Sequence, residues 1–444
     1  MGTITIVLQL LLALSILVIL HELGHFIPAR LFKIRVEKFY LFFNPWFSLF
    51  KFKKGDTEYG VGWLPLGGYV KIAGMIDESM DTEQMKKPPK PDEFRSKPAW
   101  QRLIVMIGGV TVNIILAILV YAMIAYVWGN TYVKNENLTH GLAVHSMFEE
   151  IGFQDGDKVL AIDGKKVNTS WETEKKILLR NAETVKVIHE NGEIETINIP
   201  GDFDYKVFKT GVMGDGLSPR KLMPSKIDSI VPESNASKSG LKEGDRIISI
   251  NEKVFKYWHE FRFDLAENKG SSIKLALVRD NDTIEKNIKV NKKGTIGFYP
   301  YFKDQRFETT TQHYTFLESI PAGVSDGYNT LMDYVGQMKY LFTKKGATQL
   351  GGFGTIAKIF PDTWIWEVFW NRLAFLSVIL AFMNILPIPA LDGGHVTFLL
   401  YEMVAGRPPS DRFLEKAQMI GVLILLSLML YANGNDFFRW IGGE

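Results

Sequence analysis

Two histidines near the N-terminus have the spacing of a metal-binding pair. They belong to the segment His21-Glu22-Leu23-Gly24-His25. On a helix, side chains four residues apart lie on one face, so both imidazoles can reach one zinc ion. Glu22 lies beside them, where it could take a proton from the attacking water. The chemistry expected of this pattern is metal-assisted hydrolysis.

The stretch before this motif is strongly apolar. Residues 1–20 carry no charged side chain, and about 20 apolar residues are enough to cross a bilayer. A signal peptide is the other interpretation. It is disfavoured because no basic residue precedes the stretch and no small-x-small cleavage site follows it. The sequence therefore predicts that the metal motif lies at the end of a membrane-spanning helix.

Three further segments are long and apolar enough to span a membrane, so the predicted spans are residues 4–27, 103–128, 373–389 and 417–433. Basic residues are frequent between the first two spans and occur again between the last two. This predicts that both connections are cytoplasmic. Both termini and the long segment 129–365 are then extracytoplasmic. The even balance of 51 basic and 49 acidic residues argues against nucleic-acid binding, and the lack of cysteine excludes thiolate metal sites.

The third predicted span supplies a further candidate ligand. A catalytic zinc site usually has three protein ligands. The first and third spans run in the same direction, so topology predicts Asp392 at the depth of the two histidines. Pro387 and Pro389 should end the helix just before this carboxylate. His395 is an alternative ligand, and a plain interfacial position for Asp392 is the other alternative.

Two asparagines within predicted spans have two possible roles each. Asn384 is expected to face the cavity, where it could bind the substrate backbone or the tetrahedral oxyanion. Hydrogen bonding between helices is the alternative. For Asn113 we favour the second role, because Gly108 and Gly109 precede it and allow helices to approach closely.

Residues 55–75 hold short runs of aromatic and β-branched residues on both sides of Gly67-Gly68. This pattern predicts a β-hairpin. Because an open strand edge cannot face lipid, we expect the hairpin to line the catalytic cavity. A soluble cytoplasmic hairpin is the alternative.

The long extracytoplasmic segment contains an internal repeat, in which residues 152–163 return as residues 240–251. Each copy is a Gly-acid turn that leads into a short apolar strand. Helical patterns follow near residues 170–181 and 257–268, and further strand patterns come after them. The pattern resembles a tandem pair of PDZ domains, which implies a groove where a peptide end adds as a strand. Domains that only block access are the alternative. Residues 319–342 predict an amphipathic helix, with a plain connector as the alternative.

Taken together, these motifs resemble the site-2 protease family, in the bacterial regulator-of-sigma-E type with tandem PDZ domains. The resemblance covers nearly the whole chain. It implies a zinc-dependent intramembrane endopeptidase that takes part in regulated intramembrane proteolysis. Its substrates would be single-span membrane proteins, either pre-trimmed anti-sigma factors or remnant signal peptides. It implies one zinc ion per chain, held by His21, His25 and Asp392. It assigns catalysis to Glu22. The residues that it implies as substrate contacts are Asn384, Gly67, Gly68, Tyr69 and Val70.

The expected fold is a multi-pass α-helical membrane protein with four transmembrane helices, a membrane-associated β-hairpin and two small α+β PDZ-like domains. The expected location is the bacterial cytoplasmic membrane, with the active site within the bilayer toward the cytoplasmic side. The predicted membrane segments are the zinc-motif helix (1–32), the second transmembrane helix (102–129), the third transmembrane segment (366–395) and the cytoplasmic connection with the fourth helix (396–444). Between them we expect the cytoplasmic-side region with the hairpin (33–101), the two PDZ-like domains (130–205 and 220–292) and an extracytoplasmic linker with the amphipathic helix (293–365). Two other classes of protein are alternatives to the protease. One is a membrane-bound PDZ scaffold or chaperone with a structural metal motif, and the other is a metal transporter. The first would not need Glu22, and the second would need more polar residues along its spans.

Overall fold

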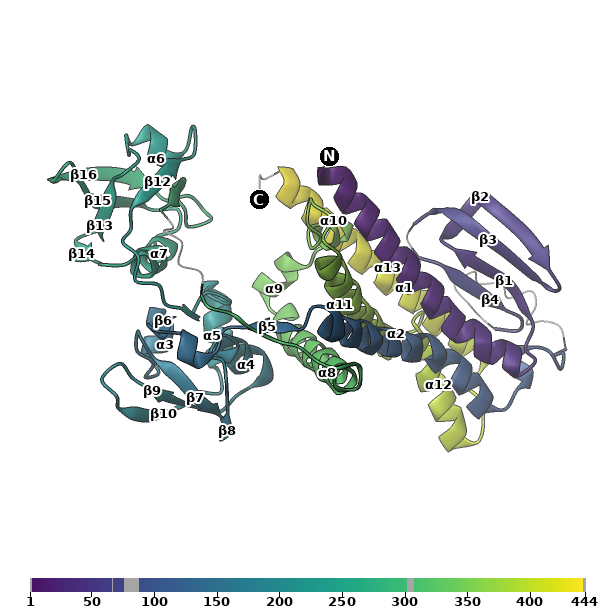
Figure 1. Cartoon of the computed structure of the whole chain (residues 1–444). Coiled ribbons are helices and arrows are strands. Elements are labelled where there is room, and N and C mark those ends of the chain that lie inside the picture. Colours follow the sequence, from purple (N-terminus) through teal and green to yellow (C-terminus); the bar gives the residue numbers. More distant parts are fainter. Residues whose placement is uncertain (1, 66, 76–87, 302–306, 442–444) are drawn as a thin grey trace. The chain divides into compact units, whose positions relative to one another are not determined.

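The computed structural model of this chain describes residues 2–65, 67–75, 88–301 and 307–441 (Figure 1). It contains two compact units. One is formed by Met1–Asn130 together with Gln312–Glu444, and the other by Thr131–Thr311. The first unit is mainly helical, and the second consists of small sheets and short helices.

Four helices in the described part of the first unit are long and apolar enough to cross a membrane. They are α1 (Gly2–Leu31), α2 (Ala99–Val127), α11 (Trp366–Ile385) and α13 (Asp411–Ile441). They agree with the four predicted spans. Further helices of this unit are α8 (Phe316–Leu341), α9 (Lys344–Gln349), α10 (Phe353–Ala357) and α12 (Asp392–Ala405), with a 3₁₀ turn at Phe94–Ser96. The Gly2 end of α1 and the Ile441 end of α13 lie at the same end of the unit (Figure 1).

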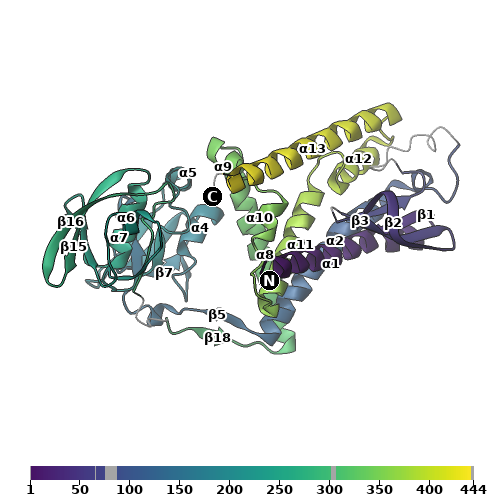
Figure 2. The same ribbon diagram turned by 90° about the horizontal axis from the view of Figure 1, so that it is seen from above.

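Helix α2 is central in this unit, since it contacts α1, α8, α11 and α12 (Figure 2). Its crossing with α1 depends on facing glycines. A methyl group built on Gly108 would overlap the carbonyl oxygen of Gly24, and one built on Gly24 would overlap that of Gly108. Glycine therefore lets the two backbones meet directly beside the histidine motif. This close contact agrees with the role predicted for Gly108.

A four-stranded sheet follows α1, formed by β1 (Val36–Leu41), β2 (Phe43–Lys54), β3 (Thr57–Leu64) and β4 (Tyr69–Ile72). The strand order is β2-β3-β1-β4. β4 pairs with β1 in antiparallel fashion, and β1 pairs with β3 in parallel. The hairpin predicted around Gly67-Gly68 is therefore wrong. The hairpin of this sheet joins β2 to β3 at Gly55, whereas the paired glycines carry the chain across β1 to the edge strand β4.

The second unit contains two lobes with the same sheet arrangement. One sheet has the order β10-β9-β7-β8 and the other the order β14-β13-β15-β16. The internal repeat thus folds into matching sheets, each with its own buried apolar cluster. The likeness to PDZ domains itself stays a prediction.

The elements of these lobes follow the sequence patterns closely. The predicted helices near residues 170–181 and 257–268 correspond to α4 (Thr173–Arg180) and α7 (Trp258–Glu267). The remaining short helices are α3 (Ser146–Glu149), α5 (Phe203–Thr210) and α6 (Asn235–Lys238), with a 3₁₀ turn at Asn135–Asn137. The strands are β5 (Asn130–Tyr132), β6 (Leu142–Val144), β7 (Lys158–Ile162), β8 (Lys165–Lys166), β9 (Thr184–Ile188), β10 (Ile194–Asn198), β11 (Leu217–Pro219), β12 (Ile227–Ile230), β13 (Arg246–Ile250), β14 (Lys253–Val254), β15 (Ser272–Arg279), β16 (Asp282–Lys289), β17 (Phe298–Pro300) and β18 (Thr310–Gln312).

Each repeat buries an aspartate that a basic side chain holds. Asp245 receives two hydrogen bonds from Arg279, at 2.7 and 2.8 Å. The corresponding Asp157 pairs with His189 instead, with 2.6 Å between Oδ1 and Nδ1. Burial alone would lower the pKa of His189, but its bonds to Asp157 and Glu195 raise that pKa above the usual histidine value. The first lobe therefore holds its aspartate with a histidine, whose charge depends on pH, and the second lobe with an arginine, which stays protonated.

Candidate metal centre

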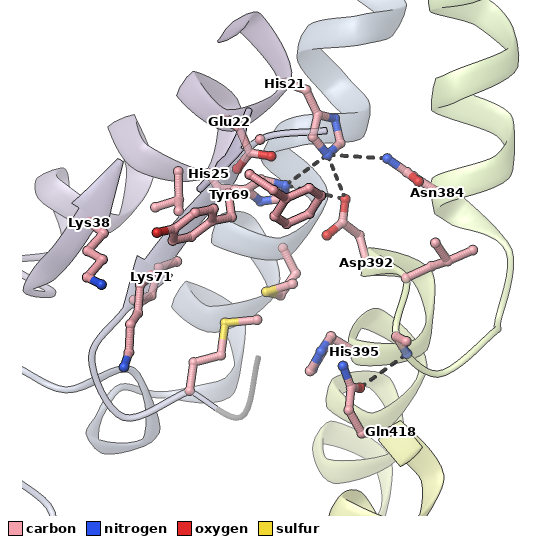
Figure 3. Close-up of a pocket in the computed structure, with 18 residues that line it drawn as sticks. His21, Glu22, His25, Lys38, Tyr69, Lys71, Asn384, Asp392, His395 and Gln418 are labelled. Carbon is pink, nitrogen blue, oxygen red and sulfur yellow. Dashed lines mark hydrogen bonds and ion pairs between the residues drawn. The ribbon is translucent and has the colours of Figure 1, made fainter. Parts of the chain in front are cut away.

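Three side-chain atoms from two distant parts of the chain converge in the helical unit. His21 Nε2 and His25 Nε2 are 3.3 Å apart, and each lies 3.3 Å from Asp392 Oδ2. The histidines come from one face of α1, and Asp392 is the first residue of α12 (Figure 3). The structure thus brings together the three residues that the sequence predicted as ligands.

The dimensions of this triangle suit a zinc ion. Tetrahedral zinc with bonds of about 2.0–2.1 Å holds its ligand atoms about 3.3–3.4 Å apart. Asp392 Oδ2 is buried and has no hydrogen-bond partner, which is costly for a carboxylate oxygen unless a cation neutralises it. Two imidazole nitrogens and a carboxylate oxygen also form a donor set that zinc prefers. The residues therefore fit the metal.

Contacts behind the histidines direct their Nε2 atoms toward Asp392. His25 Nδ1 lies 2.9 Å from the carbonyl oxygen of Val105 on α2, so it must carry the proton that it donates. The Nε2 atom then presents a lone pair, as a metal ligand requires.

The side chain of Asn113, also on α2, fixes His21 in a similar way. Its amide is fully buried and lies 3.0 Å from His21 Nδ1. Asn113 Oδ1 has no hydrogen-bond partner. The opposite amide orientation would let this oxygen accept the Nδ1 proton of His21. Asn113 therefore contacts the site rather than only packing between helices, which corrects the role we favoured from the sequence.

A cavity of about 400 Å³ opens beside the three residues (Figure 3). It is lined by Glu22, Gly68, Tyr69, Val70 and Asn384, all predicted from the sequence. Lys71 and Met75, from the segment 55–75 that we expected to line the cavity, do so as well. The lining also includes residues that were not predicted to face it, among them Lys38, Met106 and Gln418, together with His395.

Glu22 stands between the metal-ligand triangle and β4. A methyl built on Gly68 would lie 3.5 Å from the Cγ of Glu22. Gly67 does not line the cavity but forms the turn before β4, with a φ of 148° that favours glycine. The catalytic candidate is therefore directly beside a strand edge.

Asn384 and His395 lie on opposite sides of Asp392. Asn384 Nδ2 is 3.2 Å from His21 Nε2, so its amide reaches the metal-ligand triangle from the end of α11. His395 lies farther down the cavity (Figure 3). It is not part of the group of side chains that could hold a metal here, which consists of His21, His25 and Asp392.

The loop that carries Asp392 is fixed by α13. Ala390 has a φ of 81°, an unusual value for a residue with a side chain. Its amide donates a 3.1 Å hydrogen bond to Gln418 Oε1, and Gln418 is almost fully buried. A methyl on Gly421 would overlap the carbonyl of Pro389. Gln418 was not predicted from the sequence, although an amide near the start of an apolar span was a signal that could have identified it.

The model of the family described as "Peptidase family M50" matches residues 9–428. The chain belongs to peptidase family M50. It is 31% identical to the regulator of sigma E protease of Haemophilus influenzae, over 97% of this chain and 98% of the relative. It is 30% identical to a putative zinc metalloprotease of Pasteurella multocida, over 97% and 98% of the two chains. It is also 28% identical to the regulator of sigma-E protease RseP of Escherichia coli, over 97% of each chain.

This M50 member is a zinc metalloprotease, as both its family and these relatives establish. Its four apolar helices and the bacterial relatives indicate an inner-membrane protein. The predicted family and enzyme class are confirmed.

Proposed function

We propose that this protein is an intramembrane endopeptidase that binds one zinc ion per chain through His21, His25 and Asp392. The observation that carries the proposal is the triangle of three ligand atoms, each 3.3 Å from the others, in which His21 and His25 lie on α1, a helix long and apolar enough to cross a membrane. A protease that acts on soluble segments would not need its two histidine ligands on a helix of membrane-spanning length.

The reaction uses two polar side chains of the cavity. Zinc, when bound, polarises the scissile carbonyl and acidifies a water. Glu22 takes the proton of the attacking water and returns it to the leaving amine. Asn384 donates from its amide to the oxyanion or to the substrate backbone, since it approaches the triangle from the side opposite Glu22 (Figure 3).

The substrate binds as an extended strand beside β4. A transmembrane helix has its amides locked in hydrogen bonds, so it must unwind locally before cleavage. β4 is an edge strand of its sheet and lines the cavity with Gly68, Tyr69 and Val70. Addition of a strand to such an edge supplies backbone partners for the unwound segment. Gly67 shapes the turn that begins this edge.

The sheet also contacts the lipid bilayer in this proposal. Its other edge strand, β2, carries Trp46, Phe47 and Phe50, which are 89%, 55% and 61% exposed. Exposed apolar side chains at this density mark an interaction surface. We place the cavity toward the cytoplasmic side and both termini with the second unit on the extracytoplasmic side, because basic residues are concentrated in the connections between spans.

The substrates we propose are single-span membrane proteins, either pre-trimmed anti-sigma factors or remnant signal peptides. The names of the relatives as regulators of sigma E support the first class. The two repeated lobes of the second unit, as PDZ-like domains, would act as a size filter or a docking site for the trimmed end.

Mass spectrometry of products formed in proteoliposomes tests this proposal. The full-length protein is reconstituted with zinc and a single-span substrate whose ectodomain is truncated. We expect one new peptide end within the apolar span, and a Glu22→Gln variant serves as the inactive control. Cleavage only in the soluble flanks would overturn the intramembrane assignment.

A further inference from the structure

A buried ion pair joins helix α12 to helix α2. Arg102 Nη2 donates a 2.5 Å hydrogen bond to Glu402 Oε1, and the two side chains are only 14% and 16% exposed. Arg102 also donates from Nε to the carbonyl oxygen of Lys97, at 2.9 Å, which fixes the direction of its guanidinium. The pair thus connects two residues 300 positions apart in the chain, and neither of them lines the catalytic cavity.

An ion pair is a costly way to hold two helices together. Both charges must leave water, and apolar side chains of similar size would often stabilise the contact equally well. An apolar contact tolerates small shifts, whereas a charge-assisted hydrogen bond is short and directional. The pair is therefore better suited to fixing how α12 lies on α2 than to adding stability.

The same stretch of α2 also supports one of the histidine ligands. Val105 lies one turn after Arg102, and its carbonyl oxygen is 2.9 Å from His25 Nδ1. Leu399 on α12 is 5% exposed and belongs to the same buried apolar cluster as Val105. One short segment of α2 is therefore the common support of His25 and of α12, whose first residue is Asp392.

The orientation of α12 affects its two ends unequally. A helix rises about 1.5 Å per residue, so Leu399 lies about 10 Å along the axis from Asp392 and about 5 Å from Glu402. A tilt of α12 about Leu399 would therefore move Asp392 about twice as far as Glu402. A shift of about 0.5 Å at Glu402 becomes about 1 Å at Asp392, whereas metal–ligand distances tolerate only about ±0.2 Å.

We propose that Arg102 and Glu402 are positioning residues, whose ion pair sets the orientation of α12 and thereby places the Asp392 carboxylate beside the two histidines. The proposal rests on the proposed function, because it takes Asp392 as a zinc ligand. Gln418 restrains the loop before Asp392 from the side of α13. The ion pair supplies a second restraint, from the side of α2.

The test replaces the ion pair by an apolar pair in the full-length protein. Arg102→Met/Glu402→Leu keeps two side chains of similar size without a buried charge, so we expect a melting temperature near that of the wild-type protein. Zinc affinity, measured by chelator competition, should nevertheless fall about tenfold. Cobalt bound in place of zinc should show a changed visible absorption, since this spectrum depends on coordination geometry. A contact that serves stability alone would leave both readouts unchanged.

A conservative variant and a matched control complete the design. Arg102→Lys keeps a positive charge that can donate to Glu402, so its zinc affinity should stay within about threefold of the wild-type value. Arg279 and Asp245 form a comparable ion pair in the second unit, with side chains 19% and 0% exposed. Arg279→Met/Asp245→Leu should keep the wild-type zinc affinity and cobalt spectrum.

Three results would overturn the inference. Wild-type zinc affinity and cobalt spectrum in Arg102→Met/Glu402→Leu would show that the pair does not position Asp392, although the proposed function stands. Failure of this variant to fold would assign the pair to stability instead of orientation. If Asp392→Ala keeps the wild-type zinc affinity, Asp392 is not a ligand, and the proposed function fails together with the inference.

Discussion

Replacement of Gly109 by alanine should disrupt the metal centre without removing any polar group. A methyl group at position 109 of α2 would lie 2.6 Å from His21 Cε1 and 2.9 Å from His21 Nδ1, and closer still to His25 Nε2. Ordinary contacts begin at 3.4 Å, so the His21 ring must retreat by about 0.8 Å. Zinc–ligand distances tolerate only about ±0.2 Å. We expect zinc affinity to fall by about 100-fold, or roughly 2.7 kcal/mol.

Chelator competition on the purified full-length protein measures this affinity, with zinc counted by mass spectrometry and cleavage followed in parallel. Gly327→Ala is the matched control. Gly327 also lies in a helix packed on α2, but a methyl there would be 3.7 Å from its nearest neighbour. That variant should keep both zinc and activity. Retention of wild-type zinc affinity in Gly109→Ala would refute the proposed packing of the site.

Two further changes test the groups that support the site and the first lobe. Gln418→Leu removes the acceptor that holds Ala390 at its positive φ, so we expect zinc affinity to fall about tenfold. An unchanged affinity in chelator competition would show that the Asp392 loop keeps its conformation without this hydrogen bond. His189 stabilises the first lobe when charged, and its pKa is raised in the folded state. This contribution is complete below the unfolded pKa of about 6.5 and is lost as the pH rises through the folded value. Hydrogen-exchange protection of β9 should therefore decrease above pH 6.5 in the wild-type protein and change less in His189→Gln, and equal profiles would contradict this.

The sequence was sufficient to predict the residues that converge on the metal. The spacing of His21 and His25 depends only on helix geometry, and the depth of Asp392 follows from two spans that run in the same direction. Local patterns also predicted α4, α7 and α8, because their apolar residues recur with helical periodicity.

The supporting contacts could not be derived in this way. Asn113 meets His21 across 92 residues, and Gln418 meets Ala390 across 28, so each contact depends on how helices pack. The sheet shows the same limit. Alternating residues around Gly67-Gly68 predicted adjacent strands, but β1 lies between β3 and β4. Local turn signals do not indicate that a strand from earlier in the chain pairs between the two strands that flank the turn.

Cleavage of a tagged single-span substrate by Glu22→Gln, with zinc measured in the same preparation, tests the central claim most directly. Glu22 is not part of the metal-ligand triangle, so the variant should still bind one zinc ion per chain. The account predicts that cleavage is lost while zinc is retained, because the proton acceptor is gone. Wild-type cleavage by this variant would contradict the proposed mechanism.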